Sequence, residues 1–246
     1  MKAAILLATL LVTTSTSAMT AAEIVENSFN YMRGDASVST VVMTIHRPGW
    51  QREMIMDAWT LGQTDSLIRI QSPAKDKGNG TLKKCAQMWI YNPKVNRTIK
   101  LPPSMMSQSW MGSDFSNNDL AKSDSLIHDY THTLKETIEV DGHVVYLIES
   151  MPTPDAPVVW GMQRLKIRDD LILLSQEFFD EDLAPVKTMT CHDIRQMSGR
   201  LFPARWRMQK ADVEDEYTEM VYRHLAFKDA LAPSIFTLSS LKTRRR

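Results

Sequence analysis

Residues 41–59 read "VVMTIHRPGWQREMIMDAW", and this stretch decides the fold because two runs of alternating apolar residues flank a Pro-Gly turn signal. Side chains two positions apart share one face of a β-strand, so alternation gathers one set of residues on a common face. The connection is short, which favours antiparallel neighbours. We expect the shared apolar face to point inward; it consists of Val41, Met43, Ile45, Met54, Met56 and Ala58.

Short strands separated by turn signals continue along most of the chain. A first series covers residues 37–47, 51–61, 65–71, 81–92 and 96–101, and a second covers 131–140, 143–151, 158–168, 171–180, 185–196, 201–210 and 217–227. About a dozen strands with few helices predict an α+β fold that is mostly β. A single antiparallel sheet of this size must curl or close.

One strong helix precedes the strands. Thr20 and Glu23 have the spacing of a capping box, and Gly34 stands where a C-terminal cap belongs. The apolar face of this helix, which must pack against another element, consists of Ile24, Val25, Ser28, Phe29 and Met32. In the later stretch "QMWIYNP", Met88 and Ile90 alternate with Trp89 and Tyr91, which implies a strand covered on both faces. We expect the helix to cover one of them.

Residues 104–115, "SMMSQSWMGSDF", lie between the two strand series and have no clean period of two or 3.6. Asn117 or Asn118 is placed to cap a short helix over Leu120. A long segment of this kind is usually functional, as a lid or binding loop at the mouth of the sheet. The alternative is a static plug that completes the core. The residues in question are Met105, Met106, Trp110, Met111 and Phe115.

The composition and the N-terminus indicate a secreted globular protein. "MKAAILLATLLVTTSTSA" has the charge, the apolar run and the small residues of a signal peptide, so we expect residues 1–18 to be removed and residues 19–246 to form one soluble domain. The compartment expected is the bacterial periplasm. A formal net charge of zero argues against a nucleic-acid partner. The 16 methionines suit surfaces that adapt to ligands of variable shape, although Met more often fills gaps in a core.

Cys85 and Cys191 are the two cysteines of the chain. An oxidising compartment permits a disulfide between them. The alternative is a pair of free thiols, because sequence does not show whether the two Cα atoms lie close enough.

The sequence shows no pattern that points to catalysis. It has no nucleophile elbow, phosphate-binding loop, dinucleotide fingerprint or CxxC motif. His128 and His132 would need a helix to converge on a metal, and their surroundings favour a strand. Asp114 is favoured as a cap or loop anchor over a catalytic group. The basic end "LKTRRR" is favoured as a solvated terminus over a contact with anionic lipid. We therefore expect no enzyme, no cofactor and no metal.

The stretch "MWIYNPKVNRTIKLPPSMMSQSWMGSDFSNNDL", residues 88–120, resembles the signature of the LolA-like outer-membrane lipoprotein-sorting proteins. Supporting pieces are "YTHTL" (130–134), "FDEDLAPVKT" (179–188), "DIRQMSGRLFP" (193–203) and "IFTLSSL" (235–241), so the resemblance covers essentially all of residues 19–246. The sequence departs from the family at Leu183 and Ala184, where a turn glycine is expected.

The resemblance implies an open antiparallel half-barrel of about 11 strands, with an N-terminal helix and short lid helices covering its mouth. It also implies a non-enzymatic periplasmic carrier that binds lipid acyl chains or an acylated lipoprotein for transfer toward the outer membrane, touching membranes peripherally at most. An alternative is a periplasmic subunit that passes hydrophobic molecules to or from an inner-membrane transporter. A lipid hydrolase is the least favoured, because no nucleophile with its base is evident. The expected cavity and lid residues are Met43, Ile45, Met54, Met56, Trp89, Tyr91, Met105, Met106, Trp110, Met111 and Phe115.

Overall fold

The computed structural model describes residues 19–242 and begins with helix α1 (Ala21–Arg33). The Thr20 side chain accepts a hydrogen bond from the backbone N–H of Glu23, the Glu23 carboxylate completes the capping box, and Gly34 ends the helix. The predicted helix and both of its caps are thus confirmed. The predicted signal peptide, residues 1–18, lies outside the described residues, as do residues 243–246.

In the described part of the chain, one antiparallel sheet of 13 strands holds the order β6-β5-β4-β3-β2-β1-β13-β12-β11-β10-β9-β8-β7. The two predicted series meet where β1 pairs with β13, and β6 and β7 form the free edges, so the sheet does not close into a barrel. The strands are β1 (Ala36–Arg47), β2 (Trp50–Leu61), β3 (Asp65–Ser72), β4 (Gly80–Lys84), β5 (Gln87–Asn92), β6 (Arg97–Lys100), β7 (Tyr130–Val140), β8 (His143–Pro152), β9 (Met162–Arg168), β10 (Leu173–Phe179), β11 (Pro185–Met197), β12 (Arg200–Lys210) and β13 (Tyr217–Lys228).

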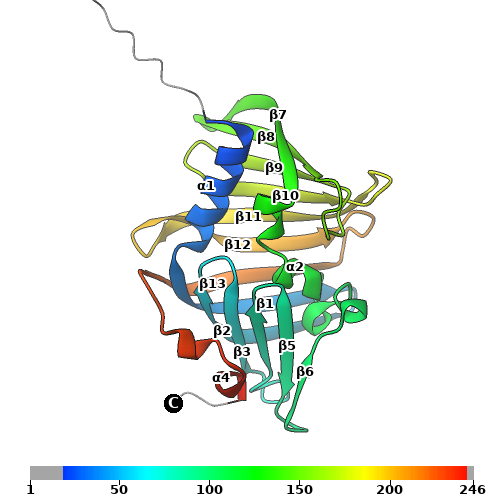
Figure 1. Cartoon of the computed structure of the whole chain (residues 1–246), viewed down its shortest axis with the longest axis vertical. Coiled ribbons are helices and arrows are strands. Elements are labelled where there is room, and N and C mark those ends of the chain that lie inside the picture. Colours follow the sequence, from blue (N-terminus) through cyan, green and yellow to red (C-terminus); the bar gives the residue numbers. More distant parts are fainter. Residues whose placement is uncertain (1–18, 243–246) are drawn as a thin grey trace, which may run out of the picture.

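The curled, mostly antiparallel β fold expected from sequence is confirmed, with a slightly different strand count. The predicted strand 81–92 is a hairpin, because the chain reverses at Cys85, where φ is 50°, and splits the run into β4 and β5. Figure 1 shows the strands β5 and β6 turned away from the direction of β8 to β12, as the accumulated twist of a long sheet requires.

Short helices lie on both faces of the sheet. Between β6 and β7 come the 3-10 turns η1 (Pro103–Met105) and η2 (Trp110–Gly112) and the helices α2 (Asn117–Ala121) and α3 (Ser125–His128). Together with α1, which runs across the strands in Figure 1, they cover what we call the inner face. The short helix is found where it was predicted, but Ser116 caps it, in a capping box with Asp119.

The C-terminal segment covers the outer face at the β2–β5 end. It consists of the 3-10 turn η3 (Pro233–Ile235) and helix α4 (Leu238–Lys242), and it packs Ile235, Phe236 and Leu241 on Leu67, Leu82 and Tyr91. Gly80 permits this approach, because a Cβ at that position would stand 2.7 Å from Leu241 Cδ1. No helix among residues 19–242 is both long and apolar enough to cross a membrane.

The disulfide left open by the sequence is not formed. Cys85 is an exposed thiol in the β4–β5 turn, and Cys191 is a buried thiol on β11. The strands β3, β2, β1, β13 and β12 separate β4 from β11 in the sheet, whereas a disulfide needs Cα atoms within about 7 Å.

Candidate functional site: a hollow beneath the inner helix

The inner face of the sheet changes character along β1, β2 and β3. Toward one end of these strands the inward side chains are large, with Met43 and Ile45 on β1 and Met54 on β2, all fully buried. Toward the other end they are small and often polar: Ser37, Ser39, Ala58, Thr60 and Ser66. The register pairs Ser39 with Ala58 and Ser37 with Thr60, so small side chains face one another across neighbouring strands.

The large end is filled by what we call the plug segment, residues 103–116. Trp110 is 1% exposed, and its indole N–H donates to the Thr81 hydroxyl at 3.0 Å. The backbone of the segment is bonded to itself from Trp110 N to Phe115 O at 2.8 Å, and to α2 from Asn118 N to Met106 O at 2.7 Å. Met105, Met106 and Met111 pack at the edge of the same cluster. The methionine face is therefore occupied by the protein's own side chains.

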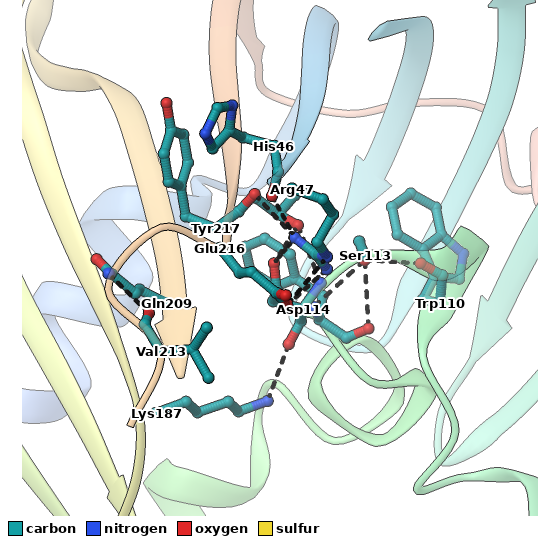
Figure 2. A network of polar contacts seen from close by, with 12 residues as sticks. His46, Arg47, Trp110, Ser113, Asp114, Lys187, Gln209, Val213, Glu216 and Tyr217 are labelled. Carbon is teal, nitrogen blue, oxygen red and sulfur yellow. Dashed lines mark hydrogen bonds and ion pairs between the residues drawn. The ribbon is translucent and has the colours of Figure 1, made fainter. Parts of the chain in front are cut away.

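A buried ion pair fastens the plug segment to the sheet (Figure 2). The Asp114 carboxylate, 1% exposed, accepts two hydrogen bonds from Arg47, at 2.8 Å from Nη2 and 3.1 Å from Nη1. Thr218 on β13 donates its hydroxyl to the same carboxylate at 2.7 Å and accepts the backbone N–H of Asp114 at 2.9 Å. Asp114 is thus a loop anchor, and these contacts join the plug segment to both central strands.

The small end is not filled, and a cavity of about 300 Å³ remains there. Its floor is the inward face of β1, β2, β3 and β13 and continues over β9 to β12. Its roof is α1 with Phe29 and Met32, and one wall is the plug segment with Trp110 and Phe115. Its size lies at the lower end of the range for ligand sites, and its lining has the usual character of an apolar pocket with a few polar groups. The apolar part of the lining includes Val41, Met56, Ile68, Met220 and Tyr222.

The cavity exists because α1 bridges over short side chains. Ile24 and Val25 of α1 are buried among Ile148, Leu165 and Leu173 at the β7–β10 end of the sheet, which fixes the helix there. At its other end, Arg33 donates from Nε to Gly62 O at 2.8 Å and from Nη2 to Asp65 O at 3.2 Å, which ties the helix to the β2–β3 turn. A helix held at both ends cannot sink onto the small side chains between them.

Charged groups gather near the Arg33 end of the cavity. Burial lowers the pKa of Arg33, and it lowers the pKa of Lys83 against the opposing effect of Asp124. Lys83 is 1% exposed and donates to Asp124 at 2.7 Å and to Gln63 O at 2.9 Å. The Lys83 charge is therefore compensated, as a buried charge must be.

Aromatic and amide groups close the opposite end. Burial raises the pKa of Tyr130 to about 12, and its hydroxyl donates to Trp160 O at 3.1 Å. Gln163 and Gln176 join their side chains at 2.5 Å in the wall of the cavity. No cluster of three or more His, Cys, Asp or Glu side chains within residues 19–242 is arranged to hold a metal ion.

The structure brings three of the predicted cavity residues into the lining of the hollow, namely Met56, Trp110 and Phe115. Met43, Ile45 and Met54 lie on the inner face as expected, but beneath the plug segment, with Met105, Met106 and Met111 packed around them. The placement of Trp89 and Tyr91 in the interior is wrong. Both point to the outer face and pack against the C-terminal segment, and the inner face of their strand carries Met88 and Ile90. The second cover of that strand is this segment and not α1.

Sequence reasoning missed the residues that make the space. Ser37 and Ser39 continue the inward parity of Val41, Met43 and Ile45, so their facing could have been found from the same alternation. The prediction selected large apolar side chains, whereas short side chains leave the space that makes a cavity. Arg33, the last residue of α1, carried no such signal, because a basic residue in the last turn of a helix is ordinary.

An open curled sheet with a helix across its inner face is a LolA-like fold. A family model described as "-like: Uncharacterized protein" matches residues 62–243, which is most of the chain. The chain belongs to the family that this model describes, and its fold is LolA-like. No curated protein matches the chain by sequence.

Solved structures share the fold over nearly the whole chain. A DUF1329 family protein from Desulfovibrio piger has a TM-score of 0.81 at 22% identity, over 90% of this chain and 97% of that one. A putative outer membrane lipoprotein-sorting protein domain from Vibrio parahaemolyticus has a TM-score of 0.79 at 21% identity, over 91% and 98%. A LolA superfamily protein from Nitrosomonas europaea has a TM-score of 0.76 at 22% identity, over 91% and 100%. At these identities the similarity establishes the fold.

Proposed function

We propose that the protein is a non-enzymatic carrier that holds the acyl chain of a lipid or lipoprotein in the cavity beneath α1. The observation that carries this proposal is the unfilled apolar hollow between α1 and the small side chains of β1, β2 and β3. The LolA-like fold supports a carrier, and one structural neighbour is itself described as a putative lipoprotein-sorting domain.

The size and chemistry of the hollow favour a single acyl chain. Burying a methylene group contributes about 0.8 kcal/mol, so a chain of ordinary length gains enough free energy to bind even after the cost of ordering the chain is subtracted.

The most buried serine of the plug segment is poorly suited to catalysis. Ser113 donates its hydroxyl to Trp110 O at 2.6 Å and has no basic side chain among its hydrogen-bond partners in the described residues.

The proposal includes the place where the carrier works. Residues 1–18 would be removed as a signal peptide, and residues 19–246 would act as one lipid-binding domain in the periplasm, moving cargo toward the outer membrane. The sequence features that support this are the apolar run of the N-terminus and the resemblance of residues 88–120.

Occupying the cavity with a side chain tests the proposal. In Ser39→Phe, an aromatic ring would enter the hollow from β1, and we expect the variant to lose binding of the neutral fluorescent probe N-phenylnaphthylamine. Transfer of a fluorescent lysophospholipid from donor to acceptor vesicles should be lost with it. The wild-type protein should show both, measured by fluorescence at equal protein concentration.

The matched control is Val38→Phe, on the same strand. Val38 is the neighbouring residue with opposite parity, so its ring would lie on the outer face, away from the cavity. We expect this variant to bind and transfer as the wild type does. Equal binding by wild type and Ser39→Phe, with both proteins folded, would exclude the cavity as the lipid site.

A further inference from the structure

The cavity lining carries an excess of positive charge. Its charged residues are Arg33, Asp119 and Lys122. Asp119 forms a buried ion pair with Lys187, which leaves the carboxylate neutralised. Lys122 donates to the backbone oxygen of Pro157. Two cations therefore remain in the lining, and no ion pair within residues 19–242 gives either of them a carboxylate partner.

Arg33 is the cation whose position allows it to bind a ligand in the cavity. Two of its three nitrogens, Nε and Nη2, donate to backbone oxygens of Gly62 and Asp65. No hydrogen bond within the described residues uses Nη1, although the side chain lines the cavity. The charges of Asp124 and Asp65 also act on Arg33, but neither carboxylate forms an ion pair with it in the described residues. A planar guanidinium with a free edge suits a carboxylate or phosphate.

Hydroxyl groups lie in the lining near the same end. Ser39 is 5% exposed and its hydroxyl makes no hydrogen bond with residues 19–242. The Tyr222 hydroxyl also lacks a partner among the described residues, and Tyr222 lines the same cavity as Arg33. Burial raises the pKa of Tyr222 to about 12, and the charge of Arg33 opposes the rise. Buried hydroxyls are normally bonded, so unpartnered ones bordering a hollow are available to a ligand.

We propose that the cavity is specific for a single-chain amphiphile with an anionic head, whose carboxylate or phosphate oxygens bind Arg33 with help from Ser39 and Tyr222. The chain would then lie along Val41, Met56, Trp110 and Phe115. This inference rests on the proposed function and names its substrate class. A fatty acid and a lysophospholipid both offer the required head.

Competition for N-phenylnaphthylamine at pH 8 tests the specificity. Dodecanoate and dodecyl phosphate represent the two anionic heads, and 1-monododecanoylglycerol provides a neutral head on the same chain. A hydrogen bond between charged groups is strong enough that the wild type should prefer at least one anion over the neutral lipid by about tenfold or more. The stronger of the two anions identifies the head as carboxylate or phosphate.

Substitutions assign the preference to a residue. In Arg33→Gln the anionic and neutral lipids should displace the probe with affinities within about threefold of one another, because the charge-assisted bond is gone. Arg33→Lys should retain a preference for anions, and Arg97→Gln, an exposed arginine on β6, should behave as the wild type does. An anionic preference that survives Arg33→Gln would overturn the assignment.

The ratio of wild-type affinities for anionic and neutral lipids tests the anionic specificity even if Arg33→Gln does not fold. Equal affinity of the wild type for neutral and anionic heads would refute the anionic specificity and leave the carrier proposal standing. If neither the probe nor any of the three lipids binds, the proposed function itself fails.

Discussion

At the residue scale, Asp114 determines how firmly the plug segment is held. It makes a bidentate ion pair with Arg47 at 2.8 and 3.1 Å and accepts the Thr218 hydroxyl, with almost no exposure to water. Removing one partner of a buried pair leaves the other charge unsatisfied. We expect Asp114→Asn to lower the free energy of unfolding by about 3 kcal/mol, measured by urea denaturation. Glu216, 3.4 Å from Arg47, limits the loss.

The control for this prediction is an exposed pair of the same kind. Asp193 stands 3.6 Å from Arg195, and both side chains are more than two fifths exposed. Asp193→Asn should change the free energy of unfolding by less than about 0.5 kcal/mol. Equal effects of the two substitutions would show that the plug segment is not anchored through Asp114.

The two thiols make a second prediction at this scale. Cys85 is exposed, whereas burial strongly raises the pKa of Cys191 and so removes its reactive thiolate. A chromogenic disulfide reagent should therefore titrate about one thiol per native chain and about two in denaturant, without any reductant. No titratable thiol in denaturant would mean that the two cysteines are joined.

At the element scale, the plug segment behaves as part of the core. Its backbone bonds resemble those of a strand in length, both within the segment from Trp110 N to Phe115 O and with α2 from Asn117 N to Gln108 O. We expect the amide hydrogens of Trp110, Asn117 and Asn118 to exchange with deuterium as slowly as those of β1, as measured by mass spectrometry or NMR. The loop 211–216 provides the fast reference. Exchange of the three amides at the rate of that loop would show a mobile lid instead.

Elements were predictable from sequence where a local rule applied. The capping box at Thr20 and Glu23 fixed α1, and alternation fixed most strands. The turn at Cys85 was missed because "KKCAQ" contains no Gly, Pro, Asn or Asp to mark it. The sequence-based placement of Trp89 and Tyr91 on the inner face of the sheet was wrong for another reason. A strand apolar on both faces does not show which face is inner, and the answer depends on a segment about 150 residues away in sequence, at Phe236 and Leu241.

At the scale of the whole molecule, the cavity forms because α1 is held at a fixed height above the sheet while the inward side chains of β1 and β2 become shorter. Helix α1 is held by the core at one end and by the Arg33 hydrogen bonds at the other. The inward side chains of the two strands change from methionine, at Met43 and Met54, to the small residues Ser39 and Ala58. The parity of these floor residues can be read from the sequence. The height of the roof cannot, because it is set by contacts between segments far apart in the chain.

The central claim is that this hollow holds a guest, and native mass spectrometry of protein freshly purified from a bacterial periplasm tests it most directly. We predict a population of wild-type protein, and of Val38→Phe, whose mass exceeds that of the chain by one single-chain amphiphile. Ser39→Phe, folded by circular dichroism, should carry none. Wild-type protein found only at its own mass, and still without an adduct after incubation with dodecanoate or lysophospholipid, would contradict the account.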